Sequence, residues 1–346
     1  MRRPVVLRLP NWVGDVVMAE PAASAVRDAF PSTPLLALAR RHLFGLLEPG
    51  TFDELIPSRG PLADTIAVRR ARPSACVLFP NSVASALPPF FAGVPRRVGY
   101  ATFGRRPLLS DPLPYPHAPG GARTPVPMPR YYAALARRLG ADVSRTRPRL
   151  SVRPEAAQRL QRHLAARGFE NRALLALNPG ASYGASKLWP PEHFARLADA
   201  VCETSDLAPV ILCAPSEKHI ADAVHERMRH KARTLNTAEE PLDLSELKAL
   251  LARAEALVTT DTGPRHIALA LDTPCVVLMG PTDPRYTDYA PPGAEIVLRR
   301  AELPCIGCHY KECPRDHACM RGITPEEALA ALRSLLRRRD GQTAKT

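Results

Sequence analysis

Short apolar runs alternate with stretches of helical periodicity along the first half of the chain. The runs have the length of buried strands and lie at residues 5–9, 35–38 and 75–79. Helical spacing follows them at residues 15–29 and 82–91. Strands that alternate with helices are typical of βαβ units, so this half predicts a parallel sheet flanked by helices.

The second half of the chain repeats this alternation more clearly. It predicts strands at residues 173–177, 209–213, 256–259 and 275–279. Helices are expected at residues 191–203, 217–229, 244–253, 264–271 and 324–338. Thr324 is the expected N-cap of the last helix, with Pro325 in its first turn. The predicted fold class is therefore α/β, with two Rossmann-like, doubly wound parallel-sheet domains.

Residues 107–129 interrupt the pattern, because eight prolines and two glycines make regular structure unfavourable there. A helix at 131–139 follows, and an Arg/Pro segment at 145–154 then marks a domain boundary. We place the first domain at residues 1–150 and the second at 151–346, with the last helix a candidate to pack back on the first. Ligands of such sheets bind beyond the carboxyl ends of the strands, so a cleft between the facing domains is the expected site.

Charge adds a second constraint. The 346 residues carry a formal net charge of +13, with 41 arginines and 6 lysines as the cations. Between Val94 and Leu150 there are 11 arginines but only two acidic residues, Asp111 and Asp142. A genomic preference for arginine would raise the total, but a local excess favours an acidic partner: phosphate, nucleic acid or an anionic membrane. No apolar run approaches the roughly 18 residues of a membrane span, and no signal peptide is recognised, so a cytoplasmic location is expected.

A conspicuous polar segment, residues 9–18, joins the first predicted strand to the first predicted helix. Gly14 permits a tight turn there, and Asp15 then stands at the start of the helix. On spacing alone Asp15 is a helix cap, since aspartate caps helices well. A catalytic carboxylate at the carboxyl edge of the sheet is the alternative.

Two further loops have the chemistry of an anion site. Residues 177–190 combine glycines, hydroxyls and the scarce Lys187 between a strand and a helix, which suits a phosphate. This loop does not match the Walker A pattern, and the chain contains no G-x-G-x-x-G motif of dinucleotide-binding enzymes. The alternative interpretation is a solvated loop in which Lys187 has no function. Residues 259–266 offer Thr262 as a cap, Pro264 in the first turn and His266 one turn inside a helix whose first N–H groups are free for an anion. His266 is equally well explained as a structural histidine.

Four cysteines cluster near the end of the chain, at Cys305, Cys308, Cys313 and Cys319. They could hold a structural zinc ion, although the spacing differs from paired Cys-x2-Cys modules. Packed reduced thiols and a redox-labile pair are the alternatives.

Taken together, seven segments in order resemble glycosyltransferase family 9, the ADP-heptose:lipopolysaccharide heptosyltransferases, most closely the heptosyltransferase II type. The resemblance covers residues 5–323, nearly the whole chain. The matching segments are 10–15 (PNWVGD), 80–82 (PNS), 92–100 (AGVPRRVGY), 179–182 (PGAS), 187–190 (KLWP), 261–268 (DTGPRHIA) and 280–284 (GPTDP).

The resemblance implies a GT-B fold and an inverting, metal-independent transfer of L-glycero-D-manno-heptose from ADP-heptose to the inner core of lipopolysaccharide. It implies no cofactor, and the chain indeed contains no Asp-x-Asp motif for a metal–diphosphate complex. Asp15 matches the family's catalytic base, which takes the proton of the acceptor hydroxyl. Lys187 matches the residue that offsets the charge of the departing ADP.

The resemblance also implies a donor site in the second domain and an acceptor site in the first. Donor contacts are expected from Gly180, Ser182, Tyr183, Glu217, Asp261, Thr262, Gly263 and His266. Acceptor contacts are expected from Asn11, Ser82, Arg96, Arg97, Arg105 and Arg106. The acceptor is then a phosphorylated lipopolysaccharide core on the anionic inner face of the inner membrane, with which the protein makes peripheral contact, and nucleic acid is not a partner.

Two other functions remain open at this stage. A related family 9 transferase could use another nucleotide sugar or acceptor, which a donor screen distinguishes. A non-catalytic basic binding protein would need stacking aromatics among its cations, yet aromatics make up only 5% of the chain.

Overall fold

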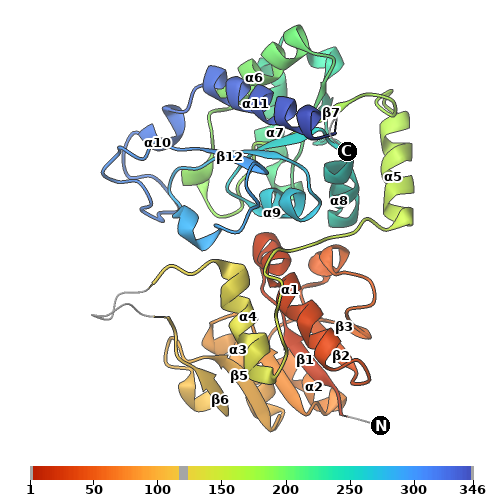
Figure 1. Cartoon of the computed structure of the whole chain (residues 1–346), viewed down its shortest axis with the longest axis vertical. Coiled ribbons are helices and arrows are strands. Elements are labelled where there is room, and N and C mark those ends of the chain that lie inside the picture. Colours follow the sequence, from red (N-terminus) through yellow and green to blue (C-terminus); the bar gives the residue numbers. More distant parts are fainter. Residues whose placement is uncertain (1–2, 117–123, 344–346) are drawn as a thin grey trace. The chain divides into compact units, whose positions relative to one another are not determined.

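The computed structural model describes residues 3–116 and 124–343, with side chains placed up to residue 338. The chain divides into two compact units, Met1–Leu150 with Arg285–Tyr289, and Ser151–Pro284 with Ala290–Thr346. Each unit is built on a six-stranded sheet whose strand pairs are all parallel (Figure 1). The predicted α/β class with two doubly wound sheets is confirmed.

The first unit carries its strands in the order β3-β2-β1-β4-β5-β6. The strands are β1 (Val5–Arg8), β2 (Leu35–Ala39), β3 (Glu54–Pro57), β4 (Ala75–Leu78), β5 (Arg96–Tyr100) and β6 (Asp111–Leu113). The helices are α1 (Val13–Ala29), α2 (Pro61–Ala71), α3 (Val83–Phe91) and α4 (Met128–Leu139), with short 3-10 turns η1 (Arg41–Leu46) and η2 (Arg106–Leu108).

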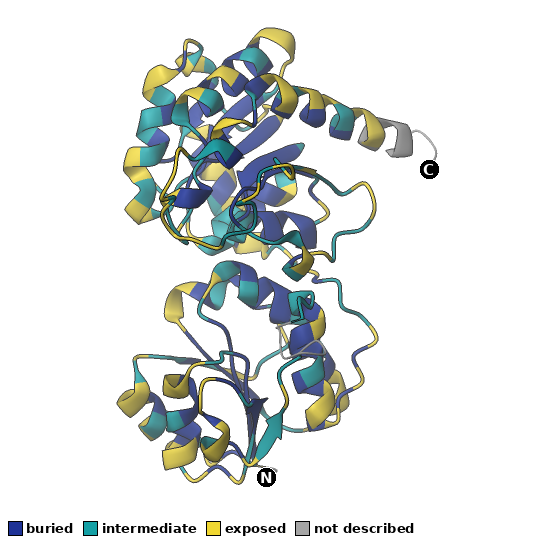
Figure 2. Ribbon diagram, turned by 90° about the vertical axis from the view of Figure 1, so that its left-hand side faces the viewer, coloured by how far each residue is buried: buried dark blue, intermediate teal, exposed yellow. Residues whose placement is uncertain are grey.

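Every residue of β1, β2 and β4 is buried, as expected for central strands covered on both faces. In this sheet Val6 and Leu38 pack with Val68 of α2 and Ala86 of α3 in one apolar cluster. Helix α1 packs on α4 instead. The buried strands are dark blue in Figure 2, and the exposed helix faces are yellow.

The elements that the pattern missed have weak apolar signals. The edge strand β3 begins with the exposed Glu54, and β5 begins with two arginines. Residues 107–129 were expected to lack regular structure, but they contain β6 and the start of α4. Pro112 is tolerated in β6 because this strand lies at the sheet edge, where a missing N–H costs no ladder bond. Residues 117–123 of this segment lie outside the described residues.

The second unit repeats the same topology, with the order β12-β11-β10-β7-β8-β9. Its strands are β7 (Leu174–Asn178), β8 (Ala208–Ile211), β9 (Leu235–Asn236), β10 (Ala256–Thr260), β11 (Cys275–Leu278) and β12 (Glu295–Leu298). Its helices are α5 (Pro154–Ala165), α6 (Pro191–Thr204), α7 (Lys218–Arg227), α8 (Leu244–Arg253), α9 (Gly263–Ala270), α10 (Ala318–Arg321) and α11 (Pro325–Thr343). The 3-10 turns are η3 (Ala185–Lys187), η4 (Pro215–Glu217), η5 (Lys231–Arg233) and η6 (Pro284–Tyr286).

The last helix, α11, packs on its own unit. It contacts α6, β10, β11 and β12. Its Leu332 and Leu335 join the core cluster that holds Trp189 and Phe194, so its apolar face is satisfied there. Within the described residues, no helix has both the length and the apolar character needed to cross a membrane.

Candidate functional site

In the second unit the strand order reverses between β7 and β10, which is where ligands of doubly wound sheets bind. Lys187 is buried at this point. Its Nζ lies 2.5 Å from the carbonyl oxygen of Asp261 and 3.3 Å from Oδ2 of the same residue. Arg265 donates to Asp261 Oδ1 at 2.7 Å, and Thr282 donates to Oδ2 at 2.7 Å. Three loops that follow neighbouring strands thus meet on one carboxylate.

Burial and neighbouring charges shift the pKa values of two residues in this cluster. Burial alone would raise the pKa of Asp261, but Lys187 and Arg265 hold that pKa below its ordinary value. Burial, aided by the positive Arg265, lowers the pKa of His266 to about 3, so its imidazole is neutral near pH 7. Arg265 also donates to both carboxylate oxygens of Glu295, at 2.9 and 2.8 Å. The charges of the two cations, Lys187 and Arg265, balance those of the two carboxylates, Asp261 and Glu295.

Glu217 approaches the backbone of the loop that precedes Lys187. Its Oε1 accepts a hydrogen bond of 3.2 Å from Ser182. A Cβ on residue 180 would lie 2.2 Å from Glu217 Oε2, so only Gly180 permits this approach. The structure therefore brings Gly180, Ser182 and Glu217 together, as the sequence predicted.

Asn178 is a residue of this site that sequence reasoning missed. Its side-chain amide donates to Thr259 at 3.1 Å, to Thr262 at 3.0 Å and to the carbonyl of Gly180 at 3.3 Å. It thereby ties the loop after β7 to the loop after β10. An asparagine that ends an otherwise apolar strand was the available signal.

Thr262 was expected to cap α9, and the structure corrects this. It stands at the N-cap position beside Gly263 but makes no side-chain cap bond, because its hydroxyl is engaged by Asn178 and by the carbonyl of Thr260. The amides of the first turn of α9 are therefore not capped by this hydroxyl.

The cysteine-rich segment, residues 305–319, contacts the loop that carries Lys187. Ser186 donates its backbone N–H to the Lys311 carbonyl at 2.9 Å and its hydroxyl to the Tyr310 carbonyl at 2.5 Å. Tyr183 donates its hydroxyl to the His309 carbonyl at 2.6 Å, and its ring lies 4.9 Å from Lys187 Nζ. The segment thus fixes the loop, and Tyr183 contacts Lys187 through its ring.

The four clustered cysteines lie within the described residues, and a zinc site formed by them stays a prediction. Cys305, Cys308, Cys313 and Cys319 are free thiols. In the part of the chain that the structure describes, no three His, Cys, Asp or Glu side chains are grouped so as to hold a metal ion. Burial, with the neighbouring thiols, raises the pKa of Cys319. The packed, reduced thiols are the alternative that agrees with this arrangement.

In the first unit, Asp15 lies in the first turn of α1, at the carboxyl edge of the sheet. The N-cap of α1 is Trp12, whose side chain makes no cap bond, so Asp15 stands inside the first turn and not at the N-cap position. Instead, Asp15 Oδ1 accepts a hydrogen bond of 2.8 Å from the hydroxyl of Tyr132 on α4.

Two predicted acceptor residues of the first unit are engaged by neighbouring groups. Asn11 accepts a hydrogen bond of 2.9 Å from the buried Arg8 through its side-chain oxygen. Ser82 is the N-cap of α3, and its hydroxyl accepts from the Ser85 amide. Both lie at the same sheet edge as Asp15, because both follow a strand at its carboxyl end.

The four predicted acceptor arginines are not gathered at that edge. Arg96 and Arg97 pair with the first residues of β4, at the amino end of the sheet, opposite Asp15. Arg96 binds Asp111, and Arg97 donates to backbone carbonyls. Arg105 is fully buried and donates to Pro80, Tyr100 and Asn81. Of the four, only Arg106 is exposed, and it begins η2. The sequence expectation for Arg96, Arg97 and Arg105 is therefore corrected.

Three arginines that were not predicted as acceptor residues lie at the carboxyl edge of the first sheet. Arg40 and Arg41 directly follow β2, and Arg59 follows β3, so all three lie at the carboxyl edge, and all three are exposed. Their place directly after a strand was the missed signal.

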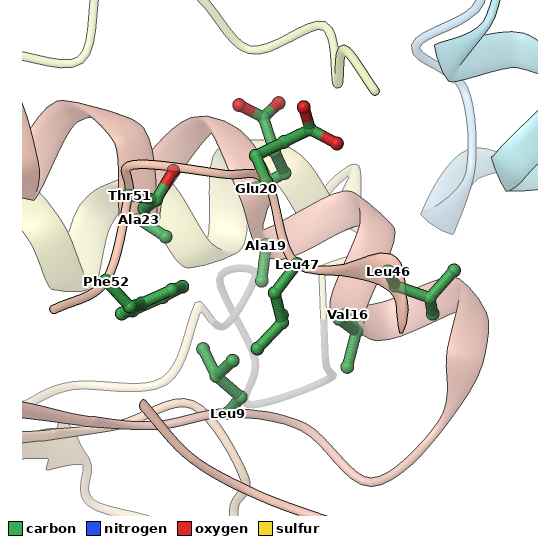
Figure 3. A pocket seen from close by; sticks show the side chains of 10 residues that line it. Leu9, Val16, Ala19, Glu20, Ala23, Leu46, Leu47, Thr51 and Phe52 are labelled. Carbon is green, nitrogen blue, oxygen red and sulfur yellow. The ribbon is translucent and has the colours of Figure 1, made fainter. Parts of the chain in front are cut away.

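The first unit also contains a small pocket beside α1, seen in Figure 3. None of the predicted site residues lines it. Its lining is mostly apolar and comprises Leu9, Val16, Ala19, Glu20, Ala23, Leu46, Leu47, Glu48, Thr51 and Phe52. The Glu20 carboxylate accepts two hydrogen bonds of 2.8 Å from Arg145, which makes this residue part of the packing of the unit.

Comparison with known proteins gives consistent results. The model of the family described as glycosyltransferase family 9 (heptosyltransferase) matches residues 67–318. The chain is 29% identical to lipooligosaccharide heptosyltransferase 2 of Haemophilus influenzae, covering 94% of this chain and 97% of that protein. It is similar to the structure of the E. coli ADP-heptose lps heptosyltransferase II, with a TM-score of 0.79, 25% identity and coverage of 97% and 99%. A glycosyl transferase family 9 structure from Veillonella parvula superposes with a TM-score of 0.80 at 22% identity, covering 97% of each chain.

Proposed function

Because this chain belongs to glycosyltransferase family 9, the heptosyltransferases, we propose that it transfers L-glycero-D-manno-heptose from ADP-heptose to the inner core of lipopolysaccharide. Similarity to heptosyltransferase 2 over 94% of the chain carries this proposal. The donor and acceptor follow the name of the E. coli structure, an ADP-heptose lps heptosyltransferase. The domain roles, with donor binding by the second unit and acceptor binding by the first, are part of the proposal.

On the donor side, the cluster around Lys187 is the proposed diphosphate site. Lys187 exchanges part of its contact with Asp261 for a phosphate oxygen, and the uncapped first turn of α9 offers backbone N–H groups. Negative charge on the phosphate grows as the glycosidic bond breaks, so Lys187 stabilises the transition state more than the bound donor. Glu217 and Ser182, which are hydrogen-bonded to each other, are the proposed contacts to sugar hydroxyls.

On the acceptor side, Asp15 is the proposed general base. The acceptor hydroxyl attacks the anomeric carbon from the face opposite ADP, its proton passes to Asp15, and the bond to ADP breaks. One displacement inverts the configuration at that carbon. No metal is required in this scheme, because Lys187 and the start of α9 supply the positive charge.

The acceptor is proposed to be anionic and bound near a membrane surface. Three exposed arginines at the carboxyl edge of the first sheet support this: Arg40, Arg41 and Arg59. Guanidinium groups bind phosphate and carboxylate in a bidentate manner. The inner face of the inner membrane is the location that such an acceptor implies.

The test is the Asp15→Asn variant, assayed with ADP-heptose in the presence of a chelator. We expect transfer to fall by about 10²- to 10⁴-fold, because the general base is removed, while ADP binding measured by calorimetry is unchanged. Asp28→Asn, at an exposed position of the same helix, is the matched control and should retain full activity.

Full turnover of Asp15→Asn would contradict the role of Asp15. Loss of transfer by the unaltered enzyme in chelator, with rescue by magnesium, would contradict the metal-free scheme. A donor screen by mass spectrometry, in which another nucleotide sugar is preferred to ADP-heptose, would favour a related family 9 transferase instead.

A further inference from the structure

The hydroxyl of Tyr132 points at the carboxylate of Asp15 from a different helix. Tyr132 lies on α4, which packs along α1, and its O–H donates to Asp15 Oδ1 at 2.8 Å. The two residues are 117 positions apart in the chain, so tertiary packing alone creates this contact. A phenol donates one directional hydrogen bond, which restrains the rotation of a carboxylate.

The ring of Tyr132 is held independently of this bond. Tyr132 is 3% exposed, and its ring meets the Phe79 ring edge to face, with centroids 5.3 Å apart. Burial, with the negative charge of Asp15, raises the pKa of Tyr132 well above its ordinary value. The hydroxyl therefore stays protonated and remains a donor at any physiological pH.

The first turn of α4 is fixed by a second tyrosine pair. Tyr100 donates its hydroxyl to the Tyr131 carbonyl at 2.8 Å, and the rings of Tyr100 and Tyr131 stack with centroids 4.0 Å apart. The Tyr131 hydroxyl meets the side chain of Asn81, which in turn accepts from Arg105. The ring stacking does not depend on the Tyr100 hydroxyl, so a Tyr100→Phe variant keeps the packing at the start of α4 and leaves the bond from Tyr132 to Asp15 in place.

We propose that Tyr132 is a positioning residue for Asp15: its hydroxyl fixes the orientation of the carboxylate and stabilises its charged form. The inference rests on the proposed role of Asp15 as the base. A donor to the ionised form favours that form, so Tyr132 keeps Asp15 deprotonated at lower pH. Neither residue 132 nor its hydroxyl was among the sites expected from the sequence.

Other charged groups near Asp15 must be kept constant in a test of this effect. The elements packed against α1 are α4 and η1. Their titratable and charged side chains are Arg130, Tyr131, Tyr132, Arg137 and Arg138 on α4, and Arg41 and His42 on η1. Tyr132→Phe leaves all the others in place and removes a single oxygen atom.

The experiment compares Tyr132→Phe with Tyr100→Phe in the full-length enzyme. Both variants remove one hydroxyl from the same cluster, but the Tyr100 hydroxyl bonds a backbone carbonyl and not Asp15. For Tyr132→Phe we expect kcat to fall about tenfold with KM for ADP-heptose unchanged, since one charge-assisted hydrogen bond is lost. The acidic limb of the kcat–pH profile should move up by about one pH unit. Tyr100→Phe should leave the profile unmoved.

An unshifted pH profile in Tyr132→Phe, or an equal loss of kcat in both variants, would overturn the proposal by showing a purely structural role. The carboxyl chemical shift of Asp15, followed by NMR titration, separates this result from a failure of the proposed function. If Asp15→Asn is active, the base assignment fails, yet a raised Asp15 pKa in Tyr132→Phe would still support positioning. An unchanged Asp15 pKa would refute it.

Discussion

Lys187 shows how one buried side chain is shared among several partners. Its ammonium group lies between the backbone and carboxylate oxygens of Asp261 and the ring of Tyr183. Asp261 also accepts from two other donors, Arg265 and Thr282, so its charge is compensated by groups other than Lys187 as well. The surrounding network thus allows Lys187 to move at small electrostatic cost.

Replacement of this lysine should affect the rate more than affinity. In Lys187→Ala, we expect kcat to fall about 10²- to 10³-fold, because a donor to the developing charge is lost. KM for ADP-heptose should change far less, as measured by steady-state kinetics. Lys231→Ala, at an exposed position of the same unit, serves as control. A rise in KM with kcat preserved would show that Lys187 only binds the donor.

At the scale of elements, the loop that carries Lys187 is hydrogen-bonded to a segment more than 120 residues later in the chain. Residues 309–311 accept three hydrogen bonds from Tyr183 and Ser186, and His317 Nε2 lies 2.6 Å from the Ser186 carbonyl. A Cβ on residue 184 would lie 2.4 Å from the Lys311 carbonyl oxygen, so the two backbones are in direct contact at Gly184. The irregular cysteine-rich segment therefore acts as a support for η3.

In Gly184→Ala, the added methyl group should push the backbone of residue 184 away from the Lys311 carbonyl. We expect the free energy of unfolding to fall by about 1–3 kcal/mol, the usual cost of overpacking, as measured by urea denaturation. Because η3 carries Lys187, kcat should fall as well. Ser186→Ala, which removes only the hydroxyl bond to Tyr310, should show a smaller loss of stability. If Gly184→Ala leaves both stability and kcat unaltered, the segment does not support the loop.

At the scale of the whole molecule, both units repeat one strand order, and the second buries Lys187, Asp261, Arg265 and His266 together at its switch point. This buried cluster has a consequence for stability. Burial, then Arg265, lowers the pKa of His266 from 6.5 to about 3 in the folded chain. Between pH 6.5 and about pH 3, His266 is protonated in the unfolded chain but neutral in the folded chain. The free energy of unfolding therefore falls as the pH falls below 6.5.

Acid should therefore weaken the second unit in a predictable window. From pH 6.5 toward pH 5, we expect His266 to remove up to about 1.4 kcal/mol per pH unit. Asp261, whose pKa is lowered from 3.8, adds to the loss only below about pH 4. The fluorescence of the buried Trp189 during urea unfolding reports the unfolding of this unit. The chain's other tryptophan, Trp12, is exposed in the first unit, so its emission should change less.

The matched variant for this measurement is His266→Gln. The pKa values of His163 and His193 are also lowered, first by burial, so some slope should remain. The slope should nevertheless be smaller in His266→Gln than in the unaltered protein. Equal slopes would mean that His266 is protonated in the folded chain.

Local patterns predicted much of the fold and the position of the loops that form the site. Apolar runs and helix periodicity located β1, β7 and α8, and the loops with Asp15 and Lys187 follow strands of their sheets. Prediction from the sequence failed for strands without an apolar run, such as β5. It also failed for arginines that were assigned to the acceptor site because arginine is abundant in that part of the sequence. Arg96 and Arg105 are close in sequence, but one lies at the amino end of a strand and the other is buried.

The sequence by itself determined the two parallel sheets, the family resemblance and the loops that carry polar groups, because these depend on neighbours within a few turns of chain. Only the tertiary structure decided which polar groups meet. Lys187 and Asp261 are 74 residues apart, and Asp15 and Tyr132 are 117 apart. A hydrogen bond needs placement within a few tenths of an ångström, and periodicity along a chain does not fix position in space to that accuracy.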